Sequence, residues 1–564
     1  MRQALAAAFG EPAAQADPLI RPSSFADYQA NVALSLAKRL GRPPLQVAMD
    51  LVRHLEAADV CEQVEVSGPG FVNLTLRDSW LADQVTALLR NERLGIDLTT
   101  QPEVVVVDYS GPNVAKEMHV GHLRTTIVGD AVVRVLECLG HRVIRQNHIG
   151  DWGTPFGMLI EHLIDVGEDE AAAQLSVGEL NRFYQQARGK FDSDPAFAER
   201  ARQRVLALQR GEPGTLRLWR LLVENSARYF HSVYRRLGVL LVDGDIRGES
   251  FYNPMLPDIA ATLEHAGIAA ISEGALCAFP PGFQGRDGQP VPLIIRKQDG
   301  GYGYAATDLA AARFRASELG ATRIVYVVGA SQALHFGMVL AVARQAGWLN
   351  SVVAEHAAIG SVLGTDGKML RTRSGRPVKL VELLDDAVER ASKLLAERDL
   401  DEATRNETAH MVGIGAVKYA DLSVARDRDY VFDPDRMVAF DGNTGPYLQY
   451  ATTRIRSIFR RAQLPLNQAE GPIAIGDPSE RALALATLGF GSCVHQVAGT
   501  LEPHRLCAYL YDLATAFTAF YERCPVLGAD DEPTRQSRLA LAALTARILT
   551  RGLDLLGIQT PERM

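Results

Sequence analysis

The stretch covering residues 104–157, VVVVDYSGPNVAKEMHVGHLRTTIVGDAVVRVLECLGHRVIRQNHIGDWGTPFG, constrains the fold of this chain more than any other. Its four opening valines are typical of a short strand that is buried on both faces of a parallel sheet. After a loop rich in Gly and Pro, apolar residues recur at helical spacing between Leu123 and Leu139, and Gly140 stands where a helix-ending glycine is expected. The apolar pair Val143-Ile144 then predicts the next parallel strand. The stretch therefore predicts a strand, a loop, a helix and a second strand in succession.

Two histidines, His119 and His122, lie where this loop becomes the helix, and Gly121 stands between them in the string HVGH. The start of a helix carries unpaired N–H groups and a positive partial charge, so it favours an anion such as a triphosphate. In that interpretation Gly121 lets a nucleotide approach the backbone closely. A zinc site is disfavoured because no Cys or carboxylate lies nearby at the usual ligand spacing. A structural role in the core stays open for one of the two histidines.

The length of 564 residues exceeds what one hydrophobic core supports, so we expect three or more domains. The formal net charge of −8 gives no general sign of nucleic-acid binding, which must rest on local basic runs. Six cysteines without a CxxC pair indicate a reducing compartment, no disulfide framework and no zinc ribbon. No apolar run approaches the ~18–20 residues of a membrane span, and the first residues, MRQALAAAFGEP, lack the pattern of a secretory signal. We therefore expect a cytoplasmic enzyme that does not contact a membrane.

Residues 1–97 are expected to form a small α+β domain. Helical patterns cover residues 25–39 and 44–56. Two segments with alternating apolar residues, 63–66 and 71–76, predict strands on either side of the turn SGPG.

Residues 98–379 alternate between strand and helix patterns, which predicts an α/β domain with a doubly wound parallel sheet. A mostly helical segment, about 161–290, interrupts the alternation and is interpreted as an insertion between the two halves of this fold. The second half is expected to resume with a strand at 293–296, followed by strands at 324–328 and 357–362. Ligands bind beyond the carboxyl ends of such strands, so the loops that follow them are candidate site loops.

The long string SGPNVAKEMHVGHLR, followed by GDWGTPFG, is far more specific than HVGH alone. It resembles the signature region of class I aminoacyl-tRNA synthetases and, among them, of arginyl-tRNA synthetases, and the resemblance covers most of the chain. It implies a Rossmann-like catalytic domain that activates L-arginine with ATP and transfers it to the 3′ end of tRNA(Arg). It also implies that Mg²⁺ arrives with ATP, that the protein binds no zinc, and that activation needs tRNA. We further expect a monomer.

The resemblance assigns four residues of the signature string to the triphosphate of ATP: Lys116, His119, Gly121 and His122. A later string, GTDGKMLRTRSGRPVKL, belongs to a run with five basic residues and no acid over positions 367–381. It lies where class I synthetases carry KMSK, here replaced by a degenerate KMLR. We expect Lys368 and Arg371 to share the phosphate role with Lys116, and a solvent-exposed basic loop is the alternative.

The block GGYGYAATDLAAARFRASELG resembles the arginine pocket of the family. Asp308 would accept the planar guanidinium, which calls for a carboxylate in a partly dry site. Its alternative role is to cap or begin the helix that runs to Leu319. Gln332, in GASQALHF, matches a Gln that contacts arginine in the family, with an exposed loop amide as the alternative, and His335 and Phe336 of the same string receive no role. The other residues implied for arginine are Asp108, Gly111, Pro112, Asn113, His122 and Tyr304.

Residues 380–436 are charged and helical in pattern, and we expect a connector that faces the tRNA stem. Residues 437–564, with helical patterns at 481–500, 504–522 and 534–556, are expected to form a bundle that resembles the family's anticodon-binding domain. Aromatic residues interleaved with arginines in GPYLQYATTRIRSIFRRA suit unpaired RNA bases and phosphates. The block GPGFVNLTL of the first domain resembles the family module that contacts the tRNA elbow. The candidate tRNA-binding residues are Phe71, Asn73, Tyr447, Gln449, Tyr450 and Arg454, with a core role as the alternative for Phe71, Tyr447 and Tyr450.

Two other functions remain open from the sequence. An HxGH nucleotidyltransferase with a small acceptor and no RNA partner would leave the C-terminal bundle and the GPGFVN block unexplained. A non-catalytic RNA-binding relative would leave the intact HVGH, Lys116 and Asp308 unexplained. Adenylate formation from arginine and ATP, assayed with and without tRNA, separates the three possibilities.

Overall fold

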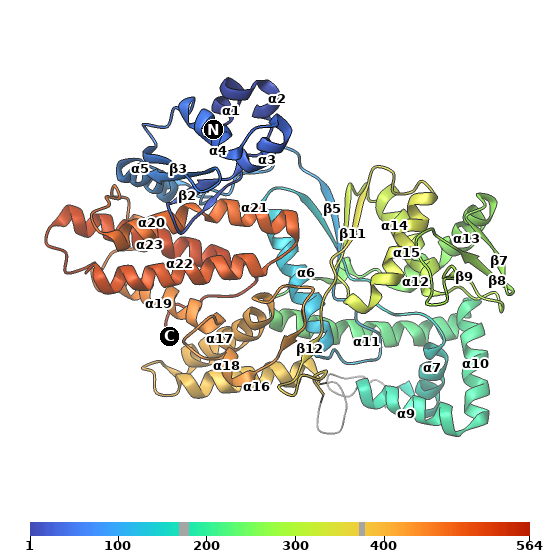
Figure 1. Cartoon of the computed structure of the whole chain (residues 1–564). Helices are drawn as coiled ribbons and strands as arrows, with labels where there is room; N and C mark the ends of the chain where they lie inside the picture. The colour runs from blue at the N-terminus through green and yellow to red at the C-terminus, as the bar shows by residue number, and fades with distance from the viewer. Residues whose placement is uncertain (169–179, 372–377) are drawn as a thin grey trace. The chain divides into compact units, whose positions relative to one another are not determined.

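The computed structural model describes residues 1–168, 180–371 and 378–564. Two compact units account for the chain. One unit joins Met1–Gly95 with Arg454–Gly491 and Asp512–Leu549, and the other joins Ile96–Thr453 with Ser492–Tyr511 and Thr550–Met564. Residues 437–564, expected to form one bundle, therefore contribute to both units. Figure 1 labels the elements along the chain.

The first unit contains a four-stranded antiparallel sheet in the order β1-β2-β4-β3. Its N-terminal elements are α1 (Arg2–Phe9), α2 (Glu11–Ala14), β1 (Ile20–Pro22), β2 (Tyr28–Ala30), α3 (Val32–Leu40), α4 (Pro44–Arg53), β3 (Cys61–Ser67), β4 (Phe71–Leu76) and α5 (Asp78–Arg90). The strands predicted at 63–66 and 71–76 are confirmed as parts of β3 and as β4. The helix predicted at 25–39 is wrong in its first part, because residues 28–30 pair with β4 and the helix begins only at Val32. Sheet pairing here outweighs the local helical spacing.

The second unit is built on a four-stranded parallel sheet in the order β11-β10-β5-β6. The strands are β5 (Val104–Asp108), β6 (Arg142–Gln146), β10 (Arg323–Tyr326) and β11 (Val353–His356), and the connecting helices are α6 (Val120–Cys138) and α15 (Ala333–Gln345). Val105, Val106 and Val107 are fully buried, as the run of valines predicts. The chain leaves β5 and β10 in opposite directions, with α6 and α15 on opposite sides of the strands (Figure 1). The doubly wound sheet is therefore confirmed, and its switch point lies between β5 and β10.

A long insertion separates the two halves of this sheet. Its described elements are α7 (Pro155–Val166), α9 (Leu180–Ser193), α10 (Pro195–Gln209), α11 (Pro213–Leu237), α12 (Glu249–Tyr252), α13 (Leu256–His265), β7 (Ala269–Ser272), β8 (Ala275–Ala278) and β9 (Leu293–Arg296), followed by α14 (Tyr304–Ser317). The expectation that the parallel sheet resumes at 293–296 is wrong, because β9 pairs antiparallel with β8 in a separate sheet. Ile294 is 45% exposed between the buried Leu293 and Ile295, which is the alternation of a strand with one solvated face.

The strand predicted at 357–362 is also misplaced. The fourth parallel strand is β11, and residues 362–363 form β12 (Val362–Leu363), which pairs with β13 (Tyr430–Val431) in a two-stranded sheet. The polar residues Glu355 and His356 concealed β11 in the sequence. A charge is accommodated there because Glu355 forms an ion pair of 2.8 Å with Arg323 on the neighbouring strand.

The rest of the chain is helical, as predicted. The helices are α16 (Leu380–Leu395), α17 (Glu402–Leu422), α18 (Pro434–Met437), α19 (Gly445–Ala462), α20 (Pro478–Leu488), α21 (Phe490–Thr500), α22 (His504–Arg523) and α23 (Glu532–Leu555). The helix predicted at 481–500 is divided into α20 and α21 at Gly489. By length and composition alone, the described stretch Pro478–Thr500 could cross a membrane, and 44% of its most apolar window lies buried in the protein.

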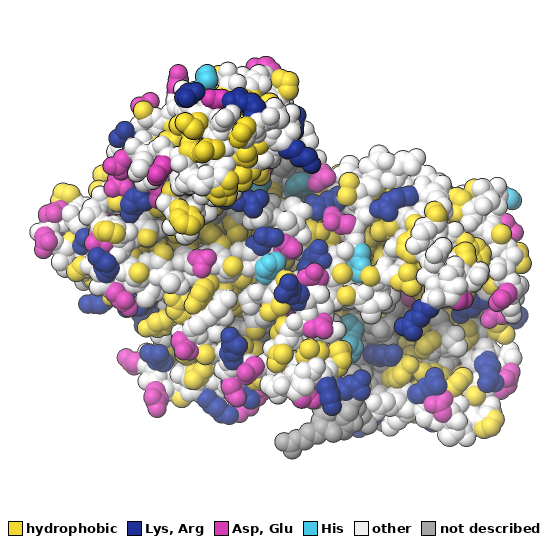
Figure 2. Space-filling model, in the orientation of Figure 1, with side chains coloured by type: hydrophobic (Ala, Val, Ile, Leu, Met, Phe, Trp, Pro, Cys, Tyr) yellow, Lys and Arg dark blue, Asp and Glu magenta, His cyan; other side chains and the backbone are white. Residues whose placement is uncertain are grey.

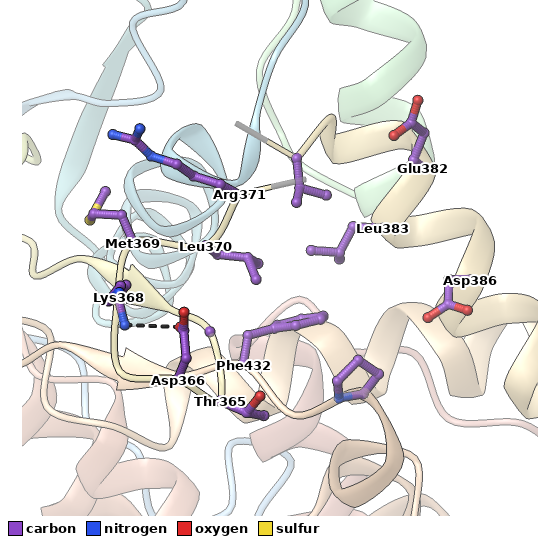
Figure 3. Close-up of a pocket in the computed structure, with 13 residues that line it drawn as sticks. Thr365, Asp366, Lys368, Met369, Leu370, Arg371, Glu382, Leu383, Asp386 and Phe432 are labelled. Carbon is purple, nitrogen blue, oxygen red and sulfur yellow. Dashed lines mark hydrogen bonds between the residues drawn. The ribbon is translucent and has the colours of Figure 1, made fainter. Parts of the chain in front are cut away.

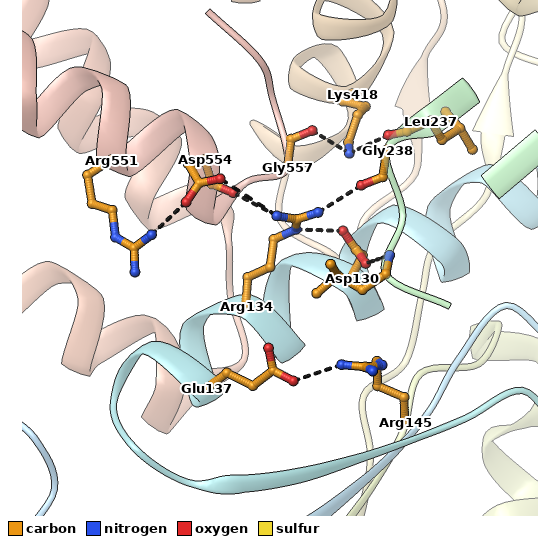
Figure 4. Close-up of polar contacts among 11 residues, drawn as sticks. Asp130, Arg134, Glu137, Arg145, Leu237, Gly238, Lys418, Arg551, Asp554 and Gly557 are labelled. Carbon is orange, nitrogen blue, oxygen red and sulfur yellow. Dashed lines mark hydrogen bonds and ion pairs between the residues drawn. The ribbon is translucent and has the colours of Figure 1, made fainter. Parts of the chain in front are cut away.

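A buried junction of charges fixes the far end of α6 (Figure 4). Asp130 and Arg134, both on α6, form an ion pair of 2.8 Å. Lys418 of α17 is fully buried, and its ammonium donates to the backbone carbonyls of Leu237 and Gly557 at 2.9 and 2.6 Å. The junction therefore joins α6 to the end of α11, to α17 and to the chain after α23.

Candidate active site

The two histidines of HVGH lie at the first turn of α6, and the backbone determines which ring nitrogen carries the proton. The N–H of Gly121 donates to Nδ1 of His119 at 3.0 Å, and the N–H of His119 donates to Nδ1 of His122 at 3.2 Å. A ring nitrogen that accepts a hydrogen bond carries no proton, so each neutral ring keeps its proton on Nε2. The ring centres lie 4.0 Å apart. Both rings can therefore offer an Nε2–H donor to phosphate oxygens at a helix start.

Both imidazoles are also held neutral. Burial, assisted by the charge of Lys116, lowers the pKa of His119. Burial, His119 and Lys116 together lower the pKa of His122 to about 3. At physiological pH these rings therefore act as hydrogen-bond donors, and positive charge for a triphosphate must come from other side chains.

A side chain at position 121 is excluded for a steric reason, in addition to the predicted role of Gly121 in letting a nucleotide approach. A Cβ at this position would lie 2.8 Å from Cε1 and 2.9 Å from Nδ1 of His119. Real Cβ atoms do not approach other atoms so closely, so Gly121 lets the ring of His119 fold over the helix start. Gly121 is itself exposed, which leaves room for the predicted approach of a nucleotide to the backbone.

The loop that carries the signature string is supported by α11, a role that the sequence did not reveal. Three side chains of α11 hydrogen-bond to it: Ser226, Tyr229 and Tyr234. The first two accept the backbone N–H groups of Ala115 and Met118 at 2.9 and 3.1 Å, and the hydroxyl of the third lies 2.7 Å from that of Ser110. Ser110 and Ala115 have positive φ angles of 75° and 58°, which are uncommon for residues other than Gly. The insertion thus holds a strained loop, and the only sequence sign was the spacing of polar residues on the buried face of an amphipathic helix.

Lys116 lies in this loop close to the two histidines, since its charge lowers the pKa of both. Its ammonium is 4.5 Å from the ring centre of Tyr184 on α9. The side chain is half-buried, so it remains accessible to an anion. The expected position of Lys116 beside HVGH is therefore present in the structure.

The KMLR string forms a hairpin. The N–H of Gly364 donates to the carbonyl of Lys368 at 2.7 Å, and the N–H of Leu370 donates to the carbonyl of Val362 at 3.1 Å. Lys368 and Arg371 are both exposed. The remaining basic residues of the string at 372–377 lie outside the described residues.

The segment after this string runs beside HVGH. The N–H of Val120 donates to the carbonyl of Val378 at 3.0 Å, and the N–H of Leu380 donates to the carbonyl of Met118 at 2.9 Å. An ion pair of 3.0 Å between Lys379 and Glu117 adds to these bonds. The two phosphate-binding candidates, distant in the sequence, are therefore attached to one another through the chain at 378–380.

A pocket of about 940 Å³ adjoins the KMLR hairpin (Figure 3). Its described lining combines Lys368 and Arg371 with the acidic Glu382 and Asp386 of α16 and with Phe432. No HVGH residue belongs to that described lining. Because acidic side chains face it and the histidines do not, this pocket does not define the triphosphate site.

Asp108 differs from its predicted role. Its carboxylate, at the end of β5, accepts from the guanidinium of Arg315 at 2.8 Å, and both side chains are buried. Arg315 also donates to Gln146 at 2.8 Å and lies 5.0 Å from the ring centre of Tyr326. An internal guanidinium therefore already pairs with the carboxylate that was expected as a second one near the substrate guanidinium, beside Asp308.

Asp308 is largely buried, with its side chain 16% exposed. It is in the second turn of α14, whose N-cap residue is Gly303, so the alternative that Asp308 caps the helix is wrong. Its Oδ2 lies 2.6 Å from Nε2 of His335 on α15. Tyr304, the first residue of α14, is 69% exposed and meets the ring of His335 edge-on, with ring centres 4.9 Å apart. Gln332 is exposed in the turn that precedes α15.

Glu249 of α12 adds a second carboxylate, which the sequence did not single out. Burial and the carboxylates of Asp151 and Asp308 raise its pKa to about 7. Asp151 accepts from the N–H and the hydroxyl of Ser250 at 2.8 and 2.6 Å. Within the described residues, no Lys or Arg forms an ion pair with Asp308 or Glu249.

The remaining loop candidates, Gly111, Pro112 and Asn113, stay beside the signature string. The N–H of Gly111, at φ 57°, donates to the side chain of Asn147 at 3.0 Å. Asn113 is exposed and bridges to Gly150, where a Cβ would lie only 2.3 Å from the amide oxygen of Asn113. Pro112 is buried. Gly150, the first glycine of the string GDWG, thus makes room for the amide of Asn113.

The candidates for tRNA contact in β4 differ in exposure. Asn73 is 8% exposed, accepts from Gln29 at 2.8 Å and donates to Ser67 at 3.0 Å. Its amide is thus already engaged within the sheet. Phe71 is half-buried, which leaves one part of its ring available for stacking.

The candidates on α19 divide in the same way. Gln449 is fully buried and donates to the carbonyls of Met411 and Gln559 at 3.0 and 2.7 Å. Tyr447, Tyr450 and Arg454 are half-buried. On the face shown in Figure 2, basic and acidic side chains are interspersed, in keeping with the net charge. Across the described ranges, no group of three or more His, Cys, Asp or Glu side chains could hold a metal ion, and all six cysteines are free and buried.

Comparison with known families matches three consecutive parts of the chain. Residues 84–434 match the catalytic domain of the class I (R) tRNA synthetases, residues 448–564 match the DALR anticodon binding domain, and residues 1–76 match the arginyl tRNA synthetase N terminal domain. Among similar curated proteins, the arginine–tRNA ligase of Thermobifida fusca is 62% identical over 566 residues, covering 100% of this chain and 98% of the relative. That of Frankia casuarinae is 54% identical over 563 residues, covering 98% and 95%.

Solved structures agree with these matches over the whole length. The arginyl-tRNA synthetase of Plasmodium falciparum has a TM-score of 0.85 at 29% identity, covering 100% of this chain and 97% of that chain. The arginyl-tRNA synthetase of Thermus thermophilus has a TM-score of 0.81 at 26% identity, covering 100% and 99%. The histidine donors at the start of α6, the doubly wound sheet and the matched domains lead to one conclusion: the chain belongs to the arginyl-tRNA synthetase family and is an arginine–tRNA ligase of class I.

Proposed function

We propose that the residues around HVGH and Asp308 carry the two steps by which this ligase charges tRNA(Arg). The carboxylate of L-arginine attacks the α-phosphate of ATP, which yields arginyl-adenylate and releases pyrophosphate. The terminal ribose hydroxyl of tRNA(Arg) then attacks the activated carbonyl. The protein contributes positioning and stabilisation of charge. The observation that carries this proposal is the pair of neutral Nε2–H donors, held by backbone N–H groups at a helix start.

The phosphates of ATP are held by His119, Gly121 and His122, and Lys116 neutralises the charge that develops on pyrophosphate. Lys116 is suited to this role because it is the cation whose charge reaches both rings. Lys368 and Arg371 complete the phosphate contacts from the KMLR hairpin. Mg²⁺ enters with the nucleotide, whose oxygens supply most of its ligands.

Arginine is recognised by Asp308 through its guanidinium, with Tyr304, Gln332, His122 and the loop of Gly111, Pro112 and Asn113 around the rest of the amino acid. The exposure of Tyr304 and Gln332 and the surplus of carboxylates near Asp308 support this assignment. A cationic fork with five donors pairs best with an unoccupied carboxylate in a partly dry site.

The tRNA is contacted by Phe71 in the N-terminal domain and by Tyr447, Tyr450 and Arg454 on α19. Asn73 and Gln449 act indirectly, because their amides are engaged within the protein. The connector of residues 380–436 faces the tRNA stem. We further infer a cytoplasmic monomer without membrane contact, since translation supplies all of its substrates there.

Activation of arginine requires tRNA. The KMLR string offers one lysine fewer to pyrophosphate than KMSK, so the free enzyme binds ATP in an unproductive way. Binding energy from tRNA at the N-terminal domain and at the C-terminal bundle closes the site. Arginine-dependent exchange of labelled pyrophosphate into ATP tests this. Cognate tRNA with an oxidised terminal ribose should restore the exchange, and vigorous exchange in RNA-free enzyme would contradict the requirement.

The phosphate role is tested with Lys116→Ala. Loss of one preorganised charge should slow adenylate formation by roughly 10²–10³-fold in single turnover, with tRNA binding unchanged. Lys393→Ala, which removes a solvent-exposed lysine of α16 that pairs with Glu389, is the matched control and should behave as wild type. Activation by Lys116→Ala within a few-fold of wild type would remove Lys116 from the mechanism.

A further inference from the structure

His335 is the one side chain that the structure records in direct polar contact with the carboxylate of Asp308, among the described residues. The two groups come from the first turn of α15 and the second turn of α14, and 27 residues of chain separate them. Their side chains are 15% and 16% exposed. The contact of 2.6 Å is therefore largely shielded from water.

The ring of His335 is held by two aromatic neighbours. Tyr304 meets it edge-on with ring centres 4.9 Å apart, and Phe336 meets it at 5.5 Å. Phe336 is in turn stacked on His356 of β11 at 5.3 Å. An imidazole with fixed neighbours directs its Nε2 to one place, which is Oδ2 of Asp308.

We propose that His335 positions the arginine-recognising carboxylate of Asp308 through the contact of its Nε2 with Oδ2. The inference rests on the proposed role of Asp308. His335 does not touch the reacting atoms in this account, so it is a positioning residue.

A neutral imidazole suits this task through its hydrogen bond. With its proton on Nε2, the ring donates to Oδ2 and occupies one of about four lone-pair sites of the carboxylate. The other sites remain for the N–H groups of the substrate guanidinium, now in a fixed orientation. Orientation of this kind matters for a planar fork, because its paired N–H groups fit a carboxylate only within a narrow range of angles.

Two substitutions at position 335 separate the hydrogen bond from the volume of the ring. Glutamine places an amide N–H close to the position of Nε2, so His335→Gln keeps the donor. Leucine removes the donor and keeps a comparable volume. KM for arginine and KM for ATP in tRNA charging are measured for the full chain at pH 7.5, with thermal unfolding as a check on folding.

His335→Leu should raise KM for arginine roughly 10–100-fold at pH 7.5 and leave KM for ATP within about two-fold, because a hydrogen bond to a charged group is lost on one substrate's side only. His335→Gln should keep KM for arginine within about three-fold at pH 7.5.

An unchanged KM for arginine in His335→Leu, or an increase in His335→Gln as large as that in His335→Leu, would overturn the role of His335. If His335→Leu proves unfolded, His335→Gln decides alone, and an increase of its KM for arginine beyond about ten-fold overturns the role. Asp308→Asn distinguishes the two levels of the argument. A normal KM for arginine in that variant refutes the proposed role of Asp308, whereas a weakened one beside unaffected His335 variants refutes only the positioning.

Discussion

Two clusters of buried charge in the catalytic unit are balanced in different ways. At the far end of α6, Asp130 pairs with Arg134, and the ammonium of Lys418 donates hydrogen bonds to backbone carbonyls (Figure 4). Near the start of α14, the carboxylates of Asp308 and Glu249 meet no Lys or Arg among the described residues. The first cluster is complete within the chain, and the second has a surplus of negative charge.

The difference separates structural from functional charge. An isolated buried charge is costly, so buried carboxylates without a Lys or Arg partner favour the binding of a cationic ligand. The substrate of this family carries such a cation. Asp108, which has its own guanidinium in Arg315, belongs with the structural cluster although it lies at the end of β5, beside the switch point of the sheet.

The largest effect is expected from Asp308, the carboxylate without a Lys or Arg partner among the described residues. Asp308→Asn keeps the shape of the side chain but removes the charge that faces the guanidinium. We expect kcat/KM for arginine to fall by roughly 10³-fold while KM for ATP changes little, because charge-assisted pairs are strong in partly dry sites. Steady-state charging with each substrate varied in turn checks this. An equal loss for both substrates would show that Asp308 supports the fold.

Asp108, the carboxylate that pairs with Arg315, should affect stability more than arginine binding when it is changed. Asp108→Asn leaves the buried guanidinium of Arg315 without its counter-ion, and breaking a buried pair in this way typically costs about 3–5 kcal/mol of stability. KM for arginine should change by less than about ten-fold in the protein that remains folded. Urea unfolding and charging assays of the same preparation test both statements. A stable Asp108→Asn variant with greatly weakened arginine binding would return Asp108 to the arginine pocket.

The sequence predicted those parts of the fold that local pattern determines. The valines of β5, the helix after HVGH and the helices of the last third each carry their own periodicity. The incorrect strand predictions occurred where pairing with a neighbouring strand decides the structure. The apolar string of β9 is compatible with parallel or antiparallel pairing, and β11 contains Glu355, which pairs with Arg323 on the next strand.

The site was predictable to a similar degree. HVGH, Lys116 and Asp308 belong to short strings, so a resemblance could find them. Their partners come from elsewhere in the chain: Tyr234 reaches Ser110 across 124 residues, and His335 reaches Asp308 across 27. Such partners have no fixed spacing from the strings that they support, and only the folded chain brings them together.

The structural cluster makes a prediction about pH. Burial is the main cause that lowers the pKa of Lys418 from 10.5 to about 8. Between these two values the unfolded chain binds the proton and the folded chain does not, so stability should rise with pH in this window and be lowest below pH 8. The free energy of unfolding of the wild type, relative to Lys418→Met, should increase by about 2 kcal/mol between pH 7 and 9.5. Urea unfolding at both pH values measures this, with the exposed Lys393→Met as control, and a constant difference would mean that Lys418 titrates normally.

The smallest effect is expected from Glu249, and it should be larger at high pH than at low pH. The pKa of this carboxyl is raised to about 7, first by burial and then by Asp151 and Asp308, so the group is largely neutral at pH 6 and largely ionised at pH 8. Only the ionised form attracts the guanidinium. Glu249→Gln should therefore raise KM for arginine a few-fold at pH 8 and have almost no effect at pH 6, because glutamine resembles the protonated acid. Arginine binding to the wild type should also release a proton near pH 7, since the incoming cation lowers the pKa of Glu249. Calorimetric titration in buffers with different ionisation enthalpies detects that proton. Its absence, or an equal effect of Glu249→Gln at both pH values, would place Glu249 outside the field of the substrate and reduce the surplus of charge to Asp308 alone.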